Sequence, residues 1–208
     1  VRLYDGIRGW FRRINAYGER RGILVEHYII SSGLREIIEG TAITKDFTHI
    51  YASSFYYNEH GEPCWPAQVI NYTNKTQFLF RIEKGILDIN DNAVNDHFAE
   101  GELRVPFRNI VYIGDSATDI PCMRLVNSLG GHSVGVYDLE NTASKDTVRR
   151  MIRDERIRYY VPADYTKGSE MDTLMHQIID KTAAYEVLEE KHLRDRKEAI
   201  IQHMEGQP

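Results

Sequence analysis

The amino-acid sequence predicts an α/β fold with a mainly parallel sheet, and three observations support this prediction. Short apolar runs without polar alternation, such as residues 110–113, are typical of strands buried on both faces. Segments with apolar side chains at helical spacing lie between such runs, as in strand–helix–strand units. A length of 208 residues is sufficient for one domain with a sizeable core.

The first expected element is a helix over residues 5–21. Asp5 and Gly6 form its N-terminal turn, arginines occupy one face, and Gly22 ends it. Because the apolar side chains recur at helical spacing, we expect them to face the core. They are Ile7, Trp10, Phe11, Ile14 and Tyr17.

A strand is expected over residues 23–30, and it leads into the small polar residues Ser31, Ser32 and Gly33. A helix follows directly, and its buried stripe is predicted to consist of Leu34, Ile37 and Ile38. Free backbone N–H groups and the helix dipole converge at such a point and favour an anion such as phosphate. The same residues are also compatible with a simple helix cap.

A hairpin beside the main sheet is predicted from two strand-like segments, residues 47–57 and 64–72, joined by turn residues. Lys75 then begins a helix whose core stripe is Phe78, Leu79 and Ile82. A lysine at a helix N-terminus is electrostatically unfavourable. It is either a solvated side chain or a cation held at a strand-end crevice to neutralise a phosphate.

Residues 109–123 hold the strongest functional signal. Asp115 directly follows the strand 110–113 and Gly114, and Asp119 comes one helical turn later. Ligands of open α/β sheets bind at the carboxyl ends of strands. Because Mg²⁺ prefers carboxylate oxygens, the two aspartates are predicted as half of a magnesium site. The alternative is that both carboxylates only cap the next helix.

The remaining elements continue the alternation of strands and helices. A polar connection over residues 88–106 precedes the strand 110–113. Later elements are expected at 120–127 (helix), 133–137 (strand), 142–156 (helix), 159–163 (strand) and from Gly168 onward (helix). Residues 1–184 are predicted to form the core, and residues 185–208 a charged helical tail that either contacts a partner, including a second copy, or frays.

Composition limits the classes of function. A net charge of -5 gives no general attraction for nucleic acid or anionic membranes. Two cysteines, Cys64 and Cys122, do not support a disulfide scaffold and suit a reducing compartment. No apolar run approaches the roughly 20 residues of a membrane span, and no signal-peptide core is found. A cytoplasmic protein is the resulting expectation.

Three features, taken in order, resemble the haloacid dehalogenase superfamily of phosphohydrolases, and within it the phosphoserine-phosphatase-like branch. Ser31 follows a hydrophobic strand, Lys75 begins a helix, and Asp115 and Asp119 form a Gly-Asp-x-x-x-Asp motif. The resemblance implies a Rossmann-like three-layer sandwich and covers about residues 23–137. It lacks one part, because the superfamily's first motif, Asp-x-Asp-x-Thr with the nucleophilic aspartate, does not occur in this chain.

The superfamily places that first strand between the strands that end at Ser31 and Gly114. We therefore expect that this central strand and the cap are missing here, and that the 208-residue chain is inactive. Either the chain is the remainder of a longer phosphatase, or something else fills the gap. For the intact protein the resemblance implies Mg²⁺-dependent hydrolysis of a small phosphorylated metabolite through an aspartyl-phosphate. Ser31, Ser32, Gly33 and Lys75 would bind the phosphate, Asp115 and Asp119 the metal, with Lys75 and Asp119 assisting catalysis.

Two alternatives belong to other classes of protein. One is a non-catalytic protein that keeps the crevice for binding phosphate or metal, or for assembly. The other is a receiver-like or nucleotide-binding domain, which would carry a phosphate-accepting aspartate or a glycine-rich loop at its first strand.

Overall fold

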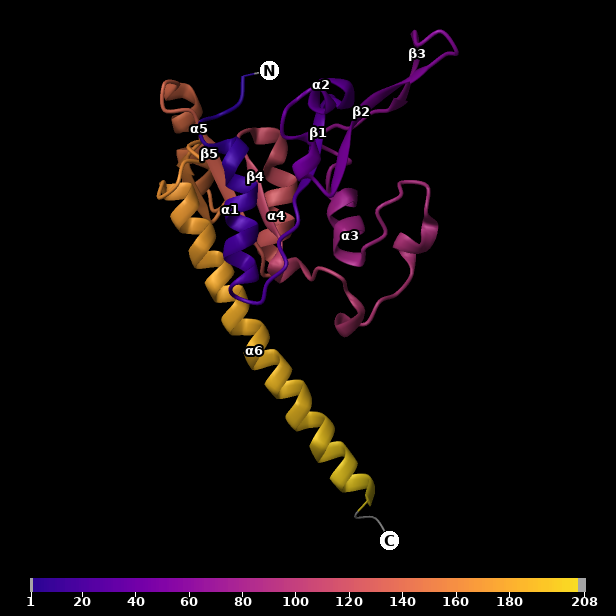
Figure 1. The fold of residues 1–208 in the computed structure, drawn as a ribbon, viewed down its shortest axis with the longest axis vertical. Coiled ribbons are helices and arrows are strands. Elements are labelled where there is room, and N and C mark those ends of the chain that lie inside the picture. Colours follow the sequence, from indigo (N-terminus) through magenta and orange to yellow (C-terminus); the bar gives the residue numbers. More distant parts are fainter. Residues whose placement is uncertain (1, 206–208) are drawn as a thin grey trace.

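The computed structural model describes residues 2–205, with side chains as far as Gln202. Six strands form two three-stranded sheets, ordered β1-β2-β3 and β4-β5-β6 (Figure 1). The strands are β1 (Tyr28–Leu34), β2 (His49–Tyr57), β3 (Pro63–Gln68), β4 (Val111–Gly114), β5 (His132–Tyr137) and β6 (Tyr159–Pro162). The α-helices are α1 (Ile7–Glu19), α2 (Arg35–Glu39), α3 (Thr76–Lys84), α4 (Ile120–Ser128), α5 (Thr142–Arg153) and α6 (Glu170–Glu205).

The sheet topology confirms the predicted fold class. β4, β5 and β6 are parallel, with Val111 opposite His132 and Val134 opposite Tyr159. In the other sheet, β1 and β2 are parallel, and β3 returns antiparallel as the predicted side hairpin. All six residues of β5 are buried, as expected for a central strand covered on both faces.

Helices cover both faces of the β4-β5-β6 sheet and give three layers. On one face, α1 and α6 pack against β5 and β6, with Trp10, Phe11 and Ile14 of α1 buried as predicted. On the other face, α4 and α5 pack against β4 and β5, and Met123 and Val148 are fully buried. Burial of these apolar side chains is the main force that holds the layers together.

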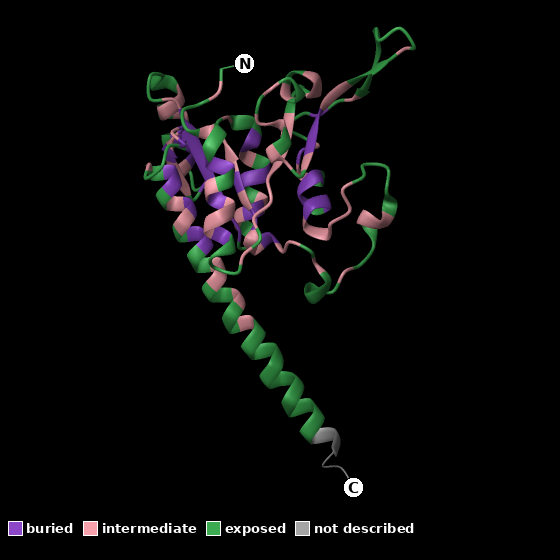
Figure 2. Cartoon of the chain, viewed as in Figure 1, coloured by how far each residue is buried: buried purple, intermediate pink, exposed green. Residues whose placement is uncertain are grey.

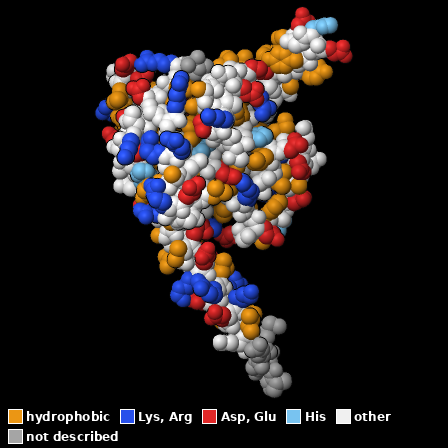
Figure 3. Space-filling view, in the orientation of Figure 1, with side chains coloured by type: hydrophobic (Ala, Val, Ile, Leu, Met, Phe, Trp, Pro, Cys, Tyr) orange, Lys and Arg blue, Asp and Glu red, His pale blue; other side chains and the backbone are white. Residues whose placement is uncertain are grey.

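The β2–β3 hairpin projects from the body with hydrophobic side chains at its surface (Figure 3), and aromatic residues are among them. Tyr56 and Trp65 are cross-strand neighbours and are 64% and 72% exposed. At the base of the hairpin, the Ser53 hydroxyl donates to the carbonyl of Ser32 and accepts from the Ile70 amide. The hairpin is thus tied to the C-terminal end of β1.

The polar connection between α3 and β4 folds around a buried arginine. The Arg81 guanidinium donates hydrogen bonds to the backbone carbonyls of Asp88, Ile89 and Asp91. Three short 3₁₀ helices follow, at Asn92–Asn95, Glu100–Glu102 and Phe107–Asn109. The segment therefore runs as a surface connection with partial helix, as the sequence predicts.

Two predictions near β1 are wrong. The strand begins at Tyr28 rather than at residue 23, because Ile23 and Val25 pack against the α1–α6 core instead of pairing with a strand. The helix after it, α2, has only five residues and none of them is buried. Ile37 of α2 and Leu34, which directly precedes it, are both exposed. A helix of five residues is too short to form a continuous apolar stripe that the core could bury.

The last helix, α6, leaves the body and projects into solvent (Figure 1). The predicted division at residue 184 falls within this continuous helix. Its N-terminal part is buried and its C-terminal part is exposed, as the green segment of Figure 2 shows. Among the helices of the described chain, none is long and apolar enough to cross a membrane.

Candidate active site

The candidate site lies between the two sheets, where β1 and β4 are not hydrogen-bonded to each other. β1 pairs only with β2, and β4 pairs only with β5, so each has one unpaired edge. Residues of both strands line a cavity of about 700 Å³. Unpaired backbone N–H and C=O groups at a buried edge are costly unless another chain segment pairs with them. We call this cavity the strand slot.

Most of the strand slot has an apolar lining. Ile14 of α1, Ile30 of β1, Leu79 of α3 and Val111 of β4 contribute to its walls. Two of these residues come from helices on opposite faces, since α1 packs with α6 and Leu79 of α3 packs with α4 and α5. The other two come from the strands. Because an extended segment in this place would meet apolar side chains above and below, the slot has the environment of a central strand.

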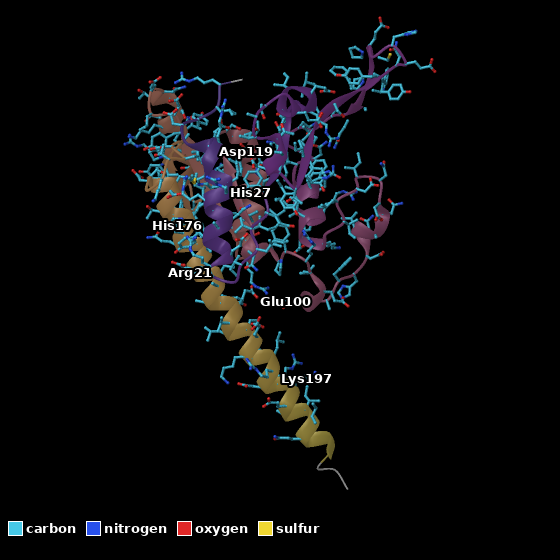
Figure 4. All side chains as sticks on the ribbon, viewed as in Figure 1. Arg21, His27, Glu100, Asp119, His176 and Lys197 are labelled. Atoms are coloured by element: carbon cyan, nitrogen blue, oxygen red, sulfur yellow. The ribbon has the colours of Figure 1, made fainter. Side chains whose placement is uncertain are left out.

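Four predicted site residues line the same cavity. Ser31 comes from β1, Lys75 precedes α3, and Asp115 and Asp119 follow β4. Ser31 lies in the C-terminal half of β1 and Asp115 directly follows β4, and ligand sites of open α/β sheets form at the carboxyl ends of strands. The structure thus brings together residues that are 44 and 40 positions apart in sequence. Figure 4 labels Asp119 near the end of β4.

Lys75 and Asp119 form a buried ion pair. Lys75 Nζ donates to Asp119 Oδ1 at 2.7 Å, and the two residues are 5% and 6% exposed. The Tyr112 hydroxyl donates to the same oxygen at 2.9 Å, and the Ser116 hydroxyl donates to Oδ2 at 3.0 Å. Both carboxylate oxygens of Asp119 are therefore engaged by donors, and the aspartate fixes the position of the lysine.

Burial and the neighbouring Asp119 carboxylate raise the pKa of Tyr112 well above its usual range. The phenol consequently stays protonated and remains a hydrogen-bond donor to Asp119 at neutral pH. The sequence pattern predicts Tyr112 only as a residue of an apolar strand. The signal for this contact in the sequence is a tyrosine seven residues before Asp119.

Gly114 is needed for the close approach of Asp119 to the strand end. A Cβ atom at position 114 would lie 2.8 Å from the Cβ, Cγ and Oδ2 atoms of Asp119. Such a contact is too short for any side chain. The glycine of the Gly-Asp-x-x-x-Asp motif therefore permits the geometry of the Lys75–Asp119 pair.

The residues fit a magnesium ion in part. Asp115 is exposed, lines the slot and makes no side-chain hydrogen bond or ion pair within the described residues, so both its oxygens are free for a cation. The oxygens of Asp119 are already occupied by three donors. In residues 2–205 no three His, Cys, Asp or Glu side chains converge as a complete metal site. Further ligands would have to come from elsewhere.

The turn after β1 differs from the strand–turn–helix arrangement expected of it. Ser31, Ser32 and Gly33 lie within β1, which has an irregularity between Ser31 and Leu34. The Gly33 amide donates to Ser31 Oγ at 3.0 Å, and the helix starts only at Arg35. Ser31 lines the slot, whereas Ser32 and Gly33 are exposed beside it.

Comparisons with known proteins agree with the superfamily that the sequence motifs resemble. The sequence model of the haloacid dehalogenase-like hydrolases matches residues 2–124, which is more than half of the chain. An uncharacterized protein of Borreliella burgdorferi is 24% identical over 188 residues. That similarity covers 82% of this chain and 64% of the relative, so the chain spans less than two thirds of the relative's length.

Proposed function

Because the chain belongs to the haloacid dehalogenase-like hydrolase family, we propose that it forms most of the catalytic core of a magnesium-dependent phosphatase. The proposed substrate is a small phosphomonoester, and the proposed branch is the phosphoserine-phosphatase-like one. The main support is that Ser31, Lys75 and Asp115 line one end of the strand slot. A hydroxyl, a cation and a free carboxylate at one strand end can bind phosphate and metal together.

The nucleophile in this proposal is an aspartate on an extended segment that fills the strand slot. The 208 residues do not contain the Asp-x-Asp-x-Thr motif, so the segment is not among them. A carboxylate oxygen would attack phosphorus, and the bond between phosphorus and the ester oxygen would break. The leaving alcohol would take up a proton, and water would then hydrolyse the acyl phosphate to inorganic phosphate.

Residues of this chain would bind and orient the phosphate. The Lys75 ammonium, hydrogen-bonded to Asp119, would balance the negative charge of the phosphate and the nucleophile. The Ser31 hydroxyl accepts from the Gly33 amide, and its own O–H would donate to a phosphate oxygen. Asp115 would supply one carboxylate ligand to Mg²⁺, which, when bound, stabilises charge on the transferring phosphoryl oxygens.

The test is hydrolysis of p-nitrophenyl phosphate by the protein expressed from its complete gene, with Mg²⁺ and with excess EDTA. We expect Mg²⁺-dependent turnover, and we expect the 208-residue chain alone to be inactive. Asp115→Asn and Lys75→Met should each lower kcat by about a hundredfold or more, since each removes transition-state charge stabilisation. Asp96→Asn, at an exposed position in the connection before β4, is the matched control.

Absence of turnover in the complete protein, together with an Asp115→Asn variant that behaves like the parent, would refute the phosphatase proposal. The second candidate function is a non-catalytic protein that binds phosphate or metal in the same crevice. The buried Lys75 favours this candidate as well, because a buried cation at a strand end can hold an anion without any chemistry. Calorimetric binding of inorganic phosphate without hydrolysis would support it.

A further inference from the structure

The projecting part of α6 is residues 187–205, and its described side chains, 187–202, make no hydrogen bond or ion pair with the body. Glu186 is the last of its side chains that is tied to the body, through Asn109 at 2.9 Å and Arg108 at 3.5 Å. Beyond this point the helix extends for roughly 28 Å at 1.5 Å per residue. An isolated helix of this length is only marginally stable in water unless its side chains are covered.

One face of this projecting helix has a symmetric order of side chains around Leu193. Glu189 and Lys197 lie four residues before and after Leu193, and Glu190 and Arg196 lie three residues before and after it. Positions three and four apart share a helix face. This face thus has an acidic turn, a central leucine that is 53% exposed, and a basic turn.

The four charges on this face are not neutralised within the chain. Neither Glu189, Glu190, Arg196 nor Lys197 makes an ion pair in the part of the chain that the structure describes. Figure 3 shows acidic and basic side chains along the projecting helix, and Figure 4 labels Lys197 there, away from the body. The face is therefore free to meet charges of another molecule.

We propose that two copies of this chain associate through this face as an antiparallel helix pair that crosses at Leu193. In an antiparallel pair, the basic turn of the second helix lies beside the acidic turn of the first. The acidic turn of the second helix likewise lies beside the basic turn of the first. The two leucines meet on the twofold axis, and the interface is self-complementary, as an isologous dimer requires. Parallel pairing would place glutamates against glutamates and is disfavoured.

The apolar side chains at the ends of the face fit the same arrangement. In antiparallel register about Leu193, Ile200 of the second copy lies opposite residues 185 and 186 of the first. Tyr185 is 43% exposed there, and the Arg108 guanidinium covers one side of its ring. Burial of Ile200 against Tyr185 would add apolar contact area to the paired charges. The proposal does not depend on the phosphatase activity.

Sedimentation velocity of the protein expressed from its complete gene tests the proposal. We expect a concentration-dependent dimer at about 10 to 200 µM that weakens when the salt concentration is raised from about 0.05 to about 0.5 M. The double variant Glu189→Lys, Glu190→Lys should weaken association by about tenfold or more, because it places like charges together. The double variant Arg196→Glu, Lys197→Glu should do the same.

Mixing the two double variants provides the decisive arm. At the four charged positions of this face, one variant has only basic residues and the other only acidic ones. An equimolar mixture should therefore form a heterodimer, although each variant alone associates weakly. The matched control exchanges Lys191 and Asp195, an ion pair on the opposite face, and should leave association unchanged. Helical circular dichroism of each variant shows that the helix is retained, since Lys, Arg and Glu have similar helix propensities.

Three results would overturn the proposal. They are a chain that stays monomeric over the whole concentration range, a dimer that none of the charge variants weakens, and a mixture that does not form the heterodimer. A dimer that the charge variants leave intact would place the contact elsewhere, for example at the unpaired edges of β1 and β4.

Discussion

Lys75 and Asp119 are 44 residues apart in sequence, yet Lys75 Nζ donates to Asp119 Oδ1 at 2.7 Å in a buried pair. The lysine precedes α3 and the aspartate precedes α4, so the pair joins two crossover units across the end of β4. A buried charge is stable only if an opposite charge and hydrogen bonds compensate for its lost hydration. The stability of this region therefore depends on both partners.

Replacement of the lysine tests this dependence directly. Lys75→Met should lower the free energy of unfolding by about 3–5 kcal/mol, because it leaves the Asp119 carboxylate buried without its cation. Urea denaturation followed by circular dichroism measures the change. Lys45→Met, at an exposed lysine without an ion pair in the described chain, should change it little. Equal effects of the two substitutions would contradict the assignment of Lys75 and Asp119 as a structural pair.

Gly114→Ala tests the close contact at the end of β4. The added methyl group would overlap Asp119, so the aspartate must move away from Lys75, and we expect a destabilisation of about 1–3 kcal/mol. Gly101→Ala is the control, since a Cβ atom at that position would meet nothing within 4 Å. The same midpoint of thermal unfolding for Gly114→Ala and Gly101→Ala would contradict the close contact between position 114 and Asp119.

His27 makes stability depend on pH. Burial lowers the pKa of His27 to about 4, and the nearby Asp46 carboxylate only partly opposes this effect. The unfolded chain binds a proton near its ordinary pKa of about 6.5, whereas the folded protein does not. Stability should therefore fall as the pH decreases from about 6.5 towards about 4.

His27→Gln should reduce this dependence of stability on pH, although the pKa of His132, also lowered by burial to about 4, contributes in the same direction. Urea midpoints between about pH 7 and pH 5 measure the slope. The exposed turn residue His60, changed to Gln, serves as the comparison. An unchanged slope in His27→Gln would show that folding does not lower the pKa of this imidazole.

The two thiols should differ in reactivity. Burial raises the pKa of Cys122 to about 11, and its side chain is fully buried beside Tyr112, whereas Cys64 on β3 is exposed. A disulfide reagent at neutral pH should modify Cys64 quickly. It should modify Cys122 only as the protein opens, because the reagent must reach the sulfur and the thiolate is the reacting species. Cys64→Ser should remove the fast phase, and loss of the slow phase instead would contradict the predicted burial.

Sequence patterns predicted α1, the β2–β3 hairpin, α3 and the elements from β4 to β6, because each has a clear apolar period or turn. They failed around β1, where Ile23 and Val25 resemble a strand but pack as an irregular segment on α1 and α6. A local pattern records that a residue is apolar. It does not record which surface buries the residue.

The sequence by itself determined the class of the fold and the residues of the candidate site, because Ser31, Lys75, Asp115 and Asp119 occur in a characteristic order. Only the tertiary structure decided which aspartate is hydrogen-bonded within the chain and which is not. Asp119 is engaged by Lys75, Tyr112 and Ser116, while Asp115 keeps its oxygens free. Hydrogen-bond partners depend on distances between distant segments, and packing alone sets those distances. The same packing left β1 and β4 unpaired on either side of the strand slot.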